Sequence, residues 1–277
     1  MNYQWYPGHM TKAVRAMQED IKLIDIVIEL LDARIPLSSR NPDIDSLANN
    51  KSRIVILNKS DLSDPSKNSF YKEYYEDKGF FVATIDSRKK NNISKVNGII
   101  EKASEKKRER DRKRGIKNRP VRAMVVGIPN VGKSTFINSF AGKASAKTGN
   151  RPGVTKGKQW IRLNNNVELL DTPGILWPKF EDERIGFNIA AIGSINDNIV
   201  DNTEIATGLI EYITGNYEGL INKRYEVSED DDIHIILENI AVKRNCLKKG
   251  GAIDYNKTCN LIIDEFRSGV IGKITLE

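Results

Sequence analysis

Short runs of apolar and β-branched residues, each bounded by turn-forming residues, recur through the first part of the chain. They cover residues 25–31, 53–57, 80–85, 121–126, 159–163 and 167–170 and are typical of buried strands. Apolar residues with helical spacing separate several of these runs, at residues 10–23, 66–78, 94–108 and 133–141. This alternation predicts an α/β fold with a mostly parallel sheet and helices on both faces. A polar turn at residues 164–166 adds one antiparallel hairpin at the sheet edge.

The strand pattern stops after about residue 178, and helical spacing of apolar residues continues at residues 204–214, 233–245 and 255–268. We therefore expect two domains, an α/β domain over residues 1–178 and a smaller all-helical domain over residues 179–277. The acidic stretch at residues 229–232 fits the N-terminal end of the second of these helices, where negative charge complements the helix dipole.

Length and composition narrow the class of protein. A chain of 277 residues can bury a substantial core, and its two cysteines, Cys246 and Cys259, show no metal-ligand pairing and suit a reducing compartment. No stretch approaches the roughly 20 apolar residues of a membrane helix, and the first ten residues do not resemble a signal peptide. We expect a cytoplasmic protein without a membrane partner, and a monomer.

The charge is uneven along the chain. Its net value is +7, and residues 106–119 are crowded with Lys and Arg. Such a concentration attracts phosphate backbones and indicates contact with RNA. The interleaved Glu105, Glu109 and Asp111 equally fit an ordinary solvated helix face, so both readings stay open.

A phosphate-binding loop lies between a predicted strand and a predicted helix. Residues 127–134 read GIPNVGKS, which matches the P-loop pattern in the context that this motif requires. Its glycines let successive amides face an anion, Lys133 reaches the terminal phosphates, and Ser134 is a ligand for Mg²⁺. The expected phosphate-binding residues are Asn130, Val131, Gly132, Lys133, Ser134, Thr135 and Gly174.

A guanine-specificity motif follows the second predicted strand. Residues 58–61 read NKSD, so that Asn58, Lys59, Ser60 and Asp61 are candidates for binding guanine. The Asp61 carboxylate can accept hydrogen bonds from guanine N1 and from the exocyclic amine, a pair of donors that adenine lacks. The tetrad alone is a weak signal, because a turn after a strand favours Asn and Asp. Beside a P-loop it becomes strong.

A third motif completes the nucleotide site. Residues 171–174 read DTPG, which places Asp171 to hold Mg²⁺ through water and the Gly174 amide to contact the γ-phosphate. Thr155, in the Gly- and Lys-rich loop at residues 148–158, is the natural switch threonine that would also bind Mg²⁺. Its alternative is an ordinary loop threonine.

The order of these motifs is unusual, because the guanine motif precedes the phosphate loop. The usual order in GTPases is the reverse, so the sequence predicts a circularly permuted GTPase. The basic segment at residues 106–119 then joins what are the two chain ends in the usual order, and the segment after Gly174 runs directly into the helical domain. A switch loop there would transmit the nucleotide state to that domain.

The combined motifs resemble those of the YlqF/RbgA family, ribosome biogenesis GTPase A, over nearly the whole chain. Besides the three nucleotide motifs they include WYPGHM at residues 5–10, DARIP at residues 32–36 and FRSG at residues 266–269, with Gly272 and Lys273. The resemblance implies a bacterial GTPase that binds a late precursor of the large (50S) ribosomal subunit, with its rRNA and ribosomal proteins. It also implies that GTP is hydrolysed there and that the protein then leaves.

One loop departs from the family pattern. After the third strand the related proteins tend to have Ser-Ala and a glycine, whereas this chain reads Asp86-Ser87-Arg88-Lys89. Asp86 and Ser87 are nevertheless expected to support guanine, with the Ser87 amide donating to guanine O6.

The group that orients the attacking water is not the usual one. Many GTPases have glutamine directly after this last motif, but here the position is Ile175, which cannot hold water. His9 resembles the family's proposed catalytic histidine, and a neutral imidazole can accept a hydrogen bond from water. From the residues alone the favoured interpretation of His9 is a structural turn histidine, and only the resemblance brings the catalytic role level with it. His234 is interpreted as a surface or structural residue.

Asn130 resembles the asparagine with which related enzymes help to hold a K⁺ ion beside the phosphates, which implies stimulation by K⁺. The alternative explanation is that asparagine is present only because it tolerates the backbone angles of the loop.

Two other function classes remain open from the sequence. The first is a nucleotide-dependent regulatory switch that binds a protein target without RNA. The second is an ATP-dependent kinase or motor, which would follow if residues 58–61 formed only a turn.

Overall fold

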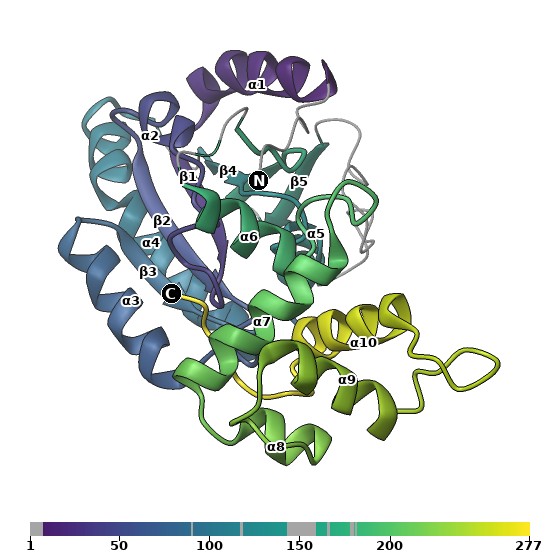
Figure 1. Ribbon diagram of the computed structural model, residues 1–277. Coiled ribbons are helices and arrows are strands. Elements are labelled where there is room, and N and C mark those ends of the chain that lie inside the picture. Colours follow the sequence, from purple (N-terminus) through teal and green to yellow (C-terminus); the bar gives the residue numbers. More distant parts are fainter. Residues whose placement is uncertain are drawn as a thin grey trace. The chain divides into compact units, whose positions relative to one another are not determined.

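The computed structural model describes residues 8–89, 91–116, 119–142, 159–164, 167–177, 180 and 182–277 (Figure 1). Within these ranges the chain divides into two compact units. The first, an α/β unit, extends to Phe180 and includes Glu277, and the second is helical and extends from Asp182 to Leu276. The division expected from the sequence, into domains of residues 1–178 and 179–277, stays a prediction.

A six-stranded sheet in the order β3-β2-β1-β4-β6-β5 forms the centre of the α/β unit. Neighbouring strands from β3 to β6 are parallel, and β5 pairs with β6 in the antiparallel direction, with Trp160 opposite Leu170. This confirms the mostly parallel sheet with one antiparallel edge. The strands are β1 (Ile26–Asp32), β2 (Ser52–Asn58), β3 (Phe81–Thr84), β4 (Val121–Val126), β5 (Gln159–Asn164) and β6 (Val167–Asp171).

Helices cover the two faces of the sheet, as the apolar periodicity predicts. In β1 every residue is buried, because alternate side chains face opposite layers. Val27, Met124 and Leu170 face α1 (Gly8–Asp20) and α2 (Asp43–Leu47), while Leu31 and Val55 on the same face meet α3 (Pro65–Asp77). On the opposite side, α4 (Asn91–Lys113) and α5 (Lys133–Ala141) lie behind the sheet in Figure 1.

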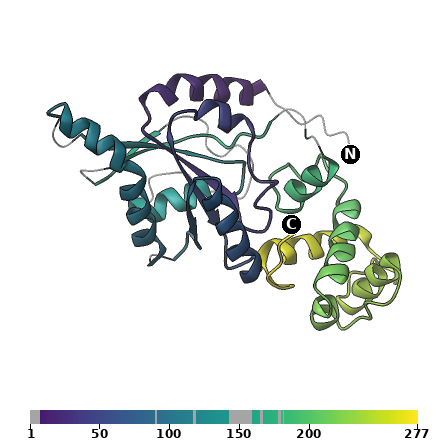
Figure 2. The ribbon, with the colours of Figure 1, turned by 90° about the vertical axis from the view of Figure 1, so that its left-hand side faces the viewer.

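The helix α4 is longer than the apolar pattern predicts. The first part of the helix packs in the core through buried residues such as Val96, Ile100 and Ala103. The helix then continues through the basic residues to Lys113. In Figure 2 its C-terminal end projects away from the sheet. The connection from β3 at one edge to β4 in the centre therefore runs through the basic segment, as the permuted motif order requires.

The helical unit contains five α-helices within residues 182–276. They are α6 (Glu183–Ala191), α7 (Asn202–Asn216), α8 (Leu220–Tyr225), α9 (Ile233–Lys243) and α10 (Tyr255–Ser268). Asp182, Asp201 and Asp254 begin α6, α7 and α10 by accepting hydrogen bonds from backbone amides of the first turn. The acidic stretch lies directly before α9, as expected, with Asp232 as the N-cap residue. Glu229 instead accepts from the amides of Gly219 and Asn222 at the start of α8.

The C-terminal residues that resemble the family terminus have a structural role. Arg267 donates to the carbonyl oxygens of Ala190 and Ala191, each at 2.9 Å, and pairs with Asp197. It thus satisfies the last carbonyls of α6. Among the described residues, no helix has the length and apolar character needed to cross a membrane.

Candidate nucleotide-binding site

The carboxyl ends of the parallel strands bring the predicted motifs to one edge of the sheet. Asp32, Asn58 and Asp171 are the last residues of β1, β2 and β6, and Gly127 directly follows β4. In open α/β sheets ligands bind outside this edge, where connections from neighbouring strands diverge. Residues 58–61 and residues 127–134 therefore meet at one end of the sheet despite their separation in the sequence.

The phosphate loop is shaped by close approaches that require glycine. Gly127 has φ 149°, and a Cβ atom there would lie 2.5 Å from the Leu30 carbonyl oxygen. Gly132 has φ 97° and begins α5, whose N-terminal amides point toward the loop. Lys133, the first residue of α5, is only 7% exposed and donates to the carbonyl oxygens of Gly127 and Ile128 at 2.9 Å each.

The switch residues lie against this loop. A Cβ atom on Gly174 would be 2.8 Å from the backbone nitrogen of Pro129 and 3.0 Å from Lys133 Nζ, so the DTPG segment touches the phosphate loop directly. Thr172 donates its hydroxyl to the Val125 carbonyl and fixes this approach. Asp171 Oδ1 is buried and has no hydrogen-bond partner in the part of the chain that the structure describes.

Burial brings the pKa values of two oppositely charged groups in this region closer together. Burial lowers the pKa of Lys133 to about 8, and the negative charge of Asp171 only partly opposes this. Burial likewise raises the pKa of Asp171 to about 6, against the influence of Lys133 and of the Thr172 amide. Phosphate oxygens beside Lys133 and a cation beside Asp171 would favour the charged form of each group. The pair therefore fits a site for Mg²⁺ and phosphate.

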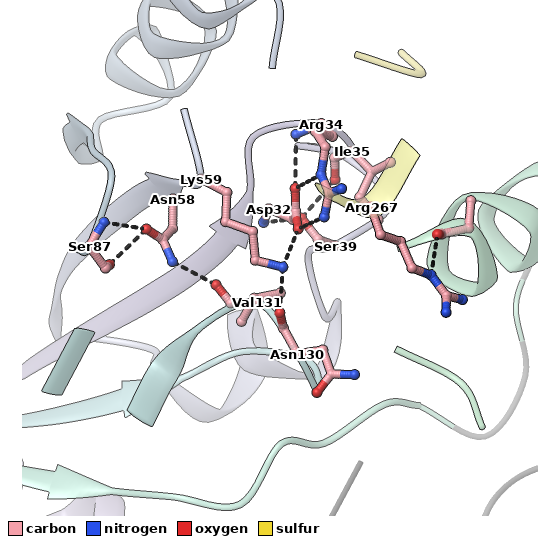
Figure 3. A network of polar contacts seen from close by, with 11 residues as sticks. Asp32, Arg34, Ile35, Ser39, Asn58, Lys59, Ser87, Asn130, Val131 and Arg267 are labelled. Carbon is pink, nitrogen blue, oxygen red and sulfur yellow. Dashed lines mark hydrogen bonds and ion pairs between the residues drawn. The ribbon is translucent and has the colours of Figure 1, made fainter. Parts of the chain in front are cut away.

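Asn58 joins the guanine motif to the phosphate loop (Figure 3). Its Nδ2 donates to the Val131 carbonyl at 2.7 Å, across 73 residues of sequence. Its Oδ1 accepts from the Ser87 amide at 3.1 Å and from the Ser87 hydroxyl at 2.7 Å. A Cβ atom on Gly132 would collide with Asn58 Nδ2, so the glycine also permits this contact. Three loops from β2, β3 and β4 are thereby held together by one side chain.

Lys59 makes a second link from the same motif. Its Nζ donates to the Asn130 carbonyl at 2.6 Å and lies 3.0 Å from Asp32 Oδ2 (Figure 3). Arg34 holds the same carboxylate through Nε and Nη2 at 2.9 and 2.8 Å. Burial alone would raise the pKa of Asp32, but the charges of Arg34 and Lys59 outweigh it and hold the pKa well below its usual range. The DARIP segment thus supports Lys59 and the phosphate loop.

Asp61, the carboxylate predicted to read guanine, has a partner that the sequence analysis missed. The Asp61 side chain accepts a hydrogen bond from Arg88 Nη2, and Arg88 is also held by Asp86, which accepts from its amide and Nε at 3.0 Å each. The Ser60 amide donates to the Ile85 carbonyl and ties this motif to the end of β3. The only sequence signal of this pairing was the departure of residues 86–89 from the family pattern.

Two predicted roles gain a structural context. The Ser87 amide already donates to Asn58, so contact with guanine O6 would require that bond to break. Asn130 has φ 61°, a left-handed conformation that asparagine tolerates. This conformation alone explains why asparagine suits the position, whether or not it also binds a K⁺ ion. Ser134 and Thr135 are half-buried on the first turn of α5.

The residues predicted to act on the reacting end are only partly placed. Thr155 and the side chain of His9 lie outside the described residues, although the backbone of His9 belongs to α1. Met17, two turns further along α1, is in the same buried cluster as Ile175. Ile175 is 4% exposed, so it packs in the core and cannot position water.

Comparison with known proteins agrees with this geometry. Ribosome biogenesis GTPase A of Priestia megaterium is 46% identical over 279 residues, which cover 100% of this chain and 97% of the relative. This chain belongs to the ribosome biogenesis GTPase A family. The protein of that name from Thermotoga maritima is 31% identical, over 99% of this chain and 93% of the relative. The family described as 50S ribosome-binding GTPase matches residues 122–239.

Solved structures of the ribosome biogenesis GTPase A family agree as well. GNP-bound YlqF from T. maritima has a TM-score of 0.67 at 26% identity, over 96% of this chain and 97% of that chain. A GDP-bound YlqF structure has a TM-score of 0.68 at 26% identity, over 95% of this chain and 98% of that chain. The predicted circularly permuted GTPase fold is confirmed, and the protein is an enzyme that hydrolyses GTP.

Proposed function

We propose that this GTPase binds a late precursor of the large ribosomal subunit, its rRNA and ribosomal proteins, and hydrolyses GTP there. The observation that carries the proposal is the pair of Asn58 hydrogen bonds, because they join a base-reading motif and a phosphate-binding loop in one site. The partner follows from the relatives, which are named for ribosome biogenesis. Such a role places the protein in the cytoplasm, as a monomer that associates with the particle.

The phosphates are bound by the amides and the lysine of the P-loop. In this proposal Lys133 exchanges its two backbone acceptors for the β- and γ-phosphates, while the amides of residues 130–135 and of Gly174 face the same oxygens. Mg²⁺, when bound, neutralises charge that develops between the β- and γ-phosphates. Its ligands would be Ser134, Thr155 and, through water, Asp171, whose buried and unpartnered Oδ1 supports the assignment.

Guanine is read on the other side of Asn58. Asp61 accepts from the base, and Lys59 holds the phosphate loop and lies along the base. Asp86 and Ser87 act as supports, Ser87 by orienting Asn58. We retain direct contact of the Ser87 amide with guanine O6 as a separate prediction.

His9 is the proposed group that orients the attacking water. It is in the first turn of α1, roughly 12 Å along the helix axis from Met17, which packs in the cluster that contains Ile175. The switch segment and α1 therefore share one layer of the α/β unit. A K⁺ ion near Asn130 is the proposed source of additional positive charge during the transfer.

The C-terminal half of α4 is the proposed RNA-contacting surface. Lys107 is nearly buried and pairs with Asp25 and Asp111 at 3.0 and 3.3 Å, so it stabilises the fold. Of the other basic residues in the turns around it, Arg108 is half-buried, and the exposed ones are Lys106, Arg110, Arg112, Lys113 and Arg114. A helix end that projects from the sheet with exposed cations suits a phosphate backbone.

GTP hydrolysis with and without large ribosomal subunits, in K⁺ and in Na⁺, tests the proposal. We expect stimulation by the particle, faster turnover in K⁺, and cosedimentation with the particle that depends on GTP. His9→Ala should slow the stimulated rate by about a hundredfold, as loss of a positioned acid or base does, and leave GTP affinity unchanged. Equal rates with and without the particle would contradict the ribosomal role.

A further inference from the structure

Arg88 lies across the guanine side of the site in the nucleotide-free protein. Its guanidinium donates to Asp61 through Nη2, while its Nε donates to Asp86 Oδ1 at 3.0 Å. The Arg88 amide donates to the same Asp86 oxygen at 3.0 Å and closes a tight turn directly after Ser87. Asp86 therefore anchors the base of the side chain, and the outer end reaches the carboxylate that reads guanine.

The chemistry of this contact resembles that of the ligand. A guanidinium presents planar N–H donors to a carboxylate, and guanine presents N1–H and its exocyclic amine to the same group. Oδ2 of Asp61, one of the two oxygens that would receive the base, is thus engaged by an internal donor. Guanine needs this oxygen for one of its two hydrogen bonds and therefore competes with Arg88 for it.

We propose that Arg88 is a specificity-determining residue whose contact with Asp61 guanine displaces. The inference rests on the proposed role of Asp61 in reading guanine. Arg88 keeps the carboxylate paired between rounds of nucleotide exchange and admits a base only when that base supplies an equivalent pair of donors. Adenine, which lacks them, would leave Asp61 unpaired after displacing Arg88.

The strength of the Arg88 contact sets the size of the effect. The Arg88 side chain is 66% exposed and that of Asp61 is 18% exposed, so solvent weakens the pair. The apparent affinity for guanine nucleotide is reduced by the fraction of molecules in which Asp61 is occupied. An exposed pair corresponds to a factor of about two to five. Displacement precedes binding, so the change appears in the association rate.

The variant Arg88→Ala tests the proposal with ribose-labelled fluorescent GDP in stopped flow. We expect the association rate constant to rise about two- to fivefold and the dissociation rate constant to stay the same. Lys89→Ala is the matched control, because it removes the same charge from the next residue of the loop without touching Asp61. Loss of that charge alone should slow the association of an anionic nucleotide, which is the opposite sign.

The same substitution in an Asp61→Asn variant separates the contact with Asp61 from other effects of Arg88. In Asp61→Asn the carboxylate is gone and xanthosine diphosphate becomes the matched ligand, so adding Arg88→Ala should slow its association only as much as adding Lys89→Ala does. A rise there, or an unchanged or slower rate for GDP in Arg88→Ala alone, would overturn the proposal, since Arg88 would then act elsewhere or clamp the base. If the wild type bound ATP as well as GTP, the guanine assignment itself would fail, independently of Arg88.

Discussion

The phosphate side and the guanine side of this site handle charge in opposite ways. Lys133 and Asp171 are 7% and 2% exposed, and burial shifts both pKa values toward neutrality. Asp61 and Arg88 have side chains that are 18% and 66% exposed and neutralise each other in the solvent. The phosphate side thus depends on its ligand for compensating charge, whereas the guanine side compensates itself. Contacts with the phosphates should therefore contribute most of the affinity for nucleotide, and the contact with the base should determine which nucleotide is preferred.

The largest expected effect comes from Lys133→Ala. Loss of a buried cation that contacts phosphate should weaken binding of every nucleotide by about thirtyfold or more, equivalent to about 2–5 kcal/mol. The protein without nucleotide should not lose thermal stability, because the substitution removes an ammonium group that is costly to bury. Calorimetric titration with GDP, beside thermal unfolding without ligand, checks both parts. Affinity within threefold of the wild type would contradict the assignment of Lys133.

A smaller and base-specific effect is expected from Asp61→Asn. Replacing the carboxylate should weaken GDP binding by about tenfold to a hundredfold, the range for hydrogen bonds to a charged group. Affinity for xanthosine diphosphate should rise, because its C2 carbonyl accepts from the new amide. Competition between the two nucleotides measures the change. An equal loss for both would show that Asp61 supports the fold and does not read the base.

The smallest effect in this series is expected from Ser87→Ala. The variant removes one buried hydrogen bond to Asn58 and keeps the amide, so the free energy of unfolding should fall by about 1 kcal/mol. Affinity for GDP should fall by about fivefold or less. Ser69→Ala, on the exposed face of α3, is the control and should change neither quantity. Denaturant unfolding and fluorescent GDP titration provide the measurements. No change in Ser87→Ala would argue against a role of Asn58 as the connecting residue.

The sheet and its helices were largely accessible from the sequence. Short runs of apolar and β-branched residues placed every strand within about two residues, because parallel strands buried on both faces must be apolar. The helices α2, α6 and α8 were not predicted, since five to nine residues carry too little periodic signal. The basic half of α4 lacks an apolar stripe, yet helix-favouring Lys, Arg and Glu continue the helix into solvent.

The site was predicted as separate motifs, and the contacts between them were not. The P-loop, guanine and DTPG patterns placed the candidate residues because their spacing follows from strand ends. No local pattern could show that the Glu229 side chain accepts hydrogen bonds at the start of α8 or that Arg88 contacts Asp61. Both contacts depend on how the loops fold back. His9 and Thr155 remain predictions.

The position of Asn58 has a consequence for the order in which the site is assembled during translation. Its partner Ser87 is synthesised before β4 and its other partner Val131, and β6 follows later still. Because chains begin to fold from the N-terminus as they are made, the half of the site that reads the base can form on the nascent chain first. GTP cannot be retained until the strands that carry the phosphate loop and Asp171 have joined the sheet.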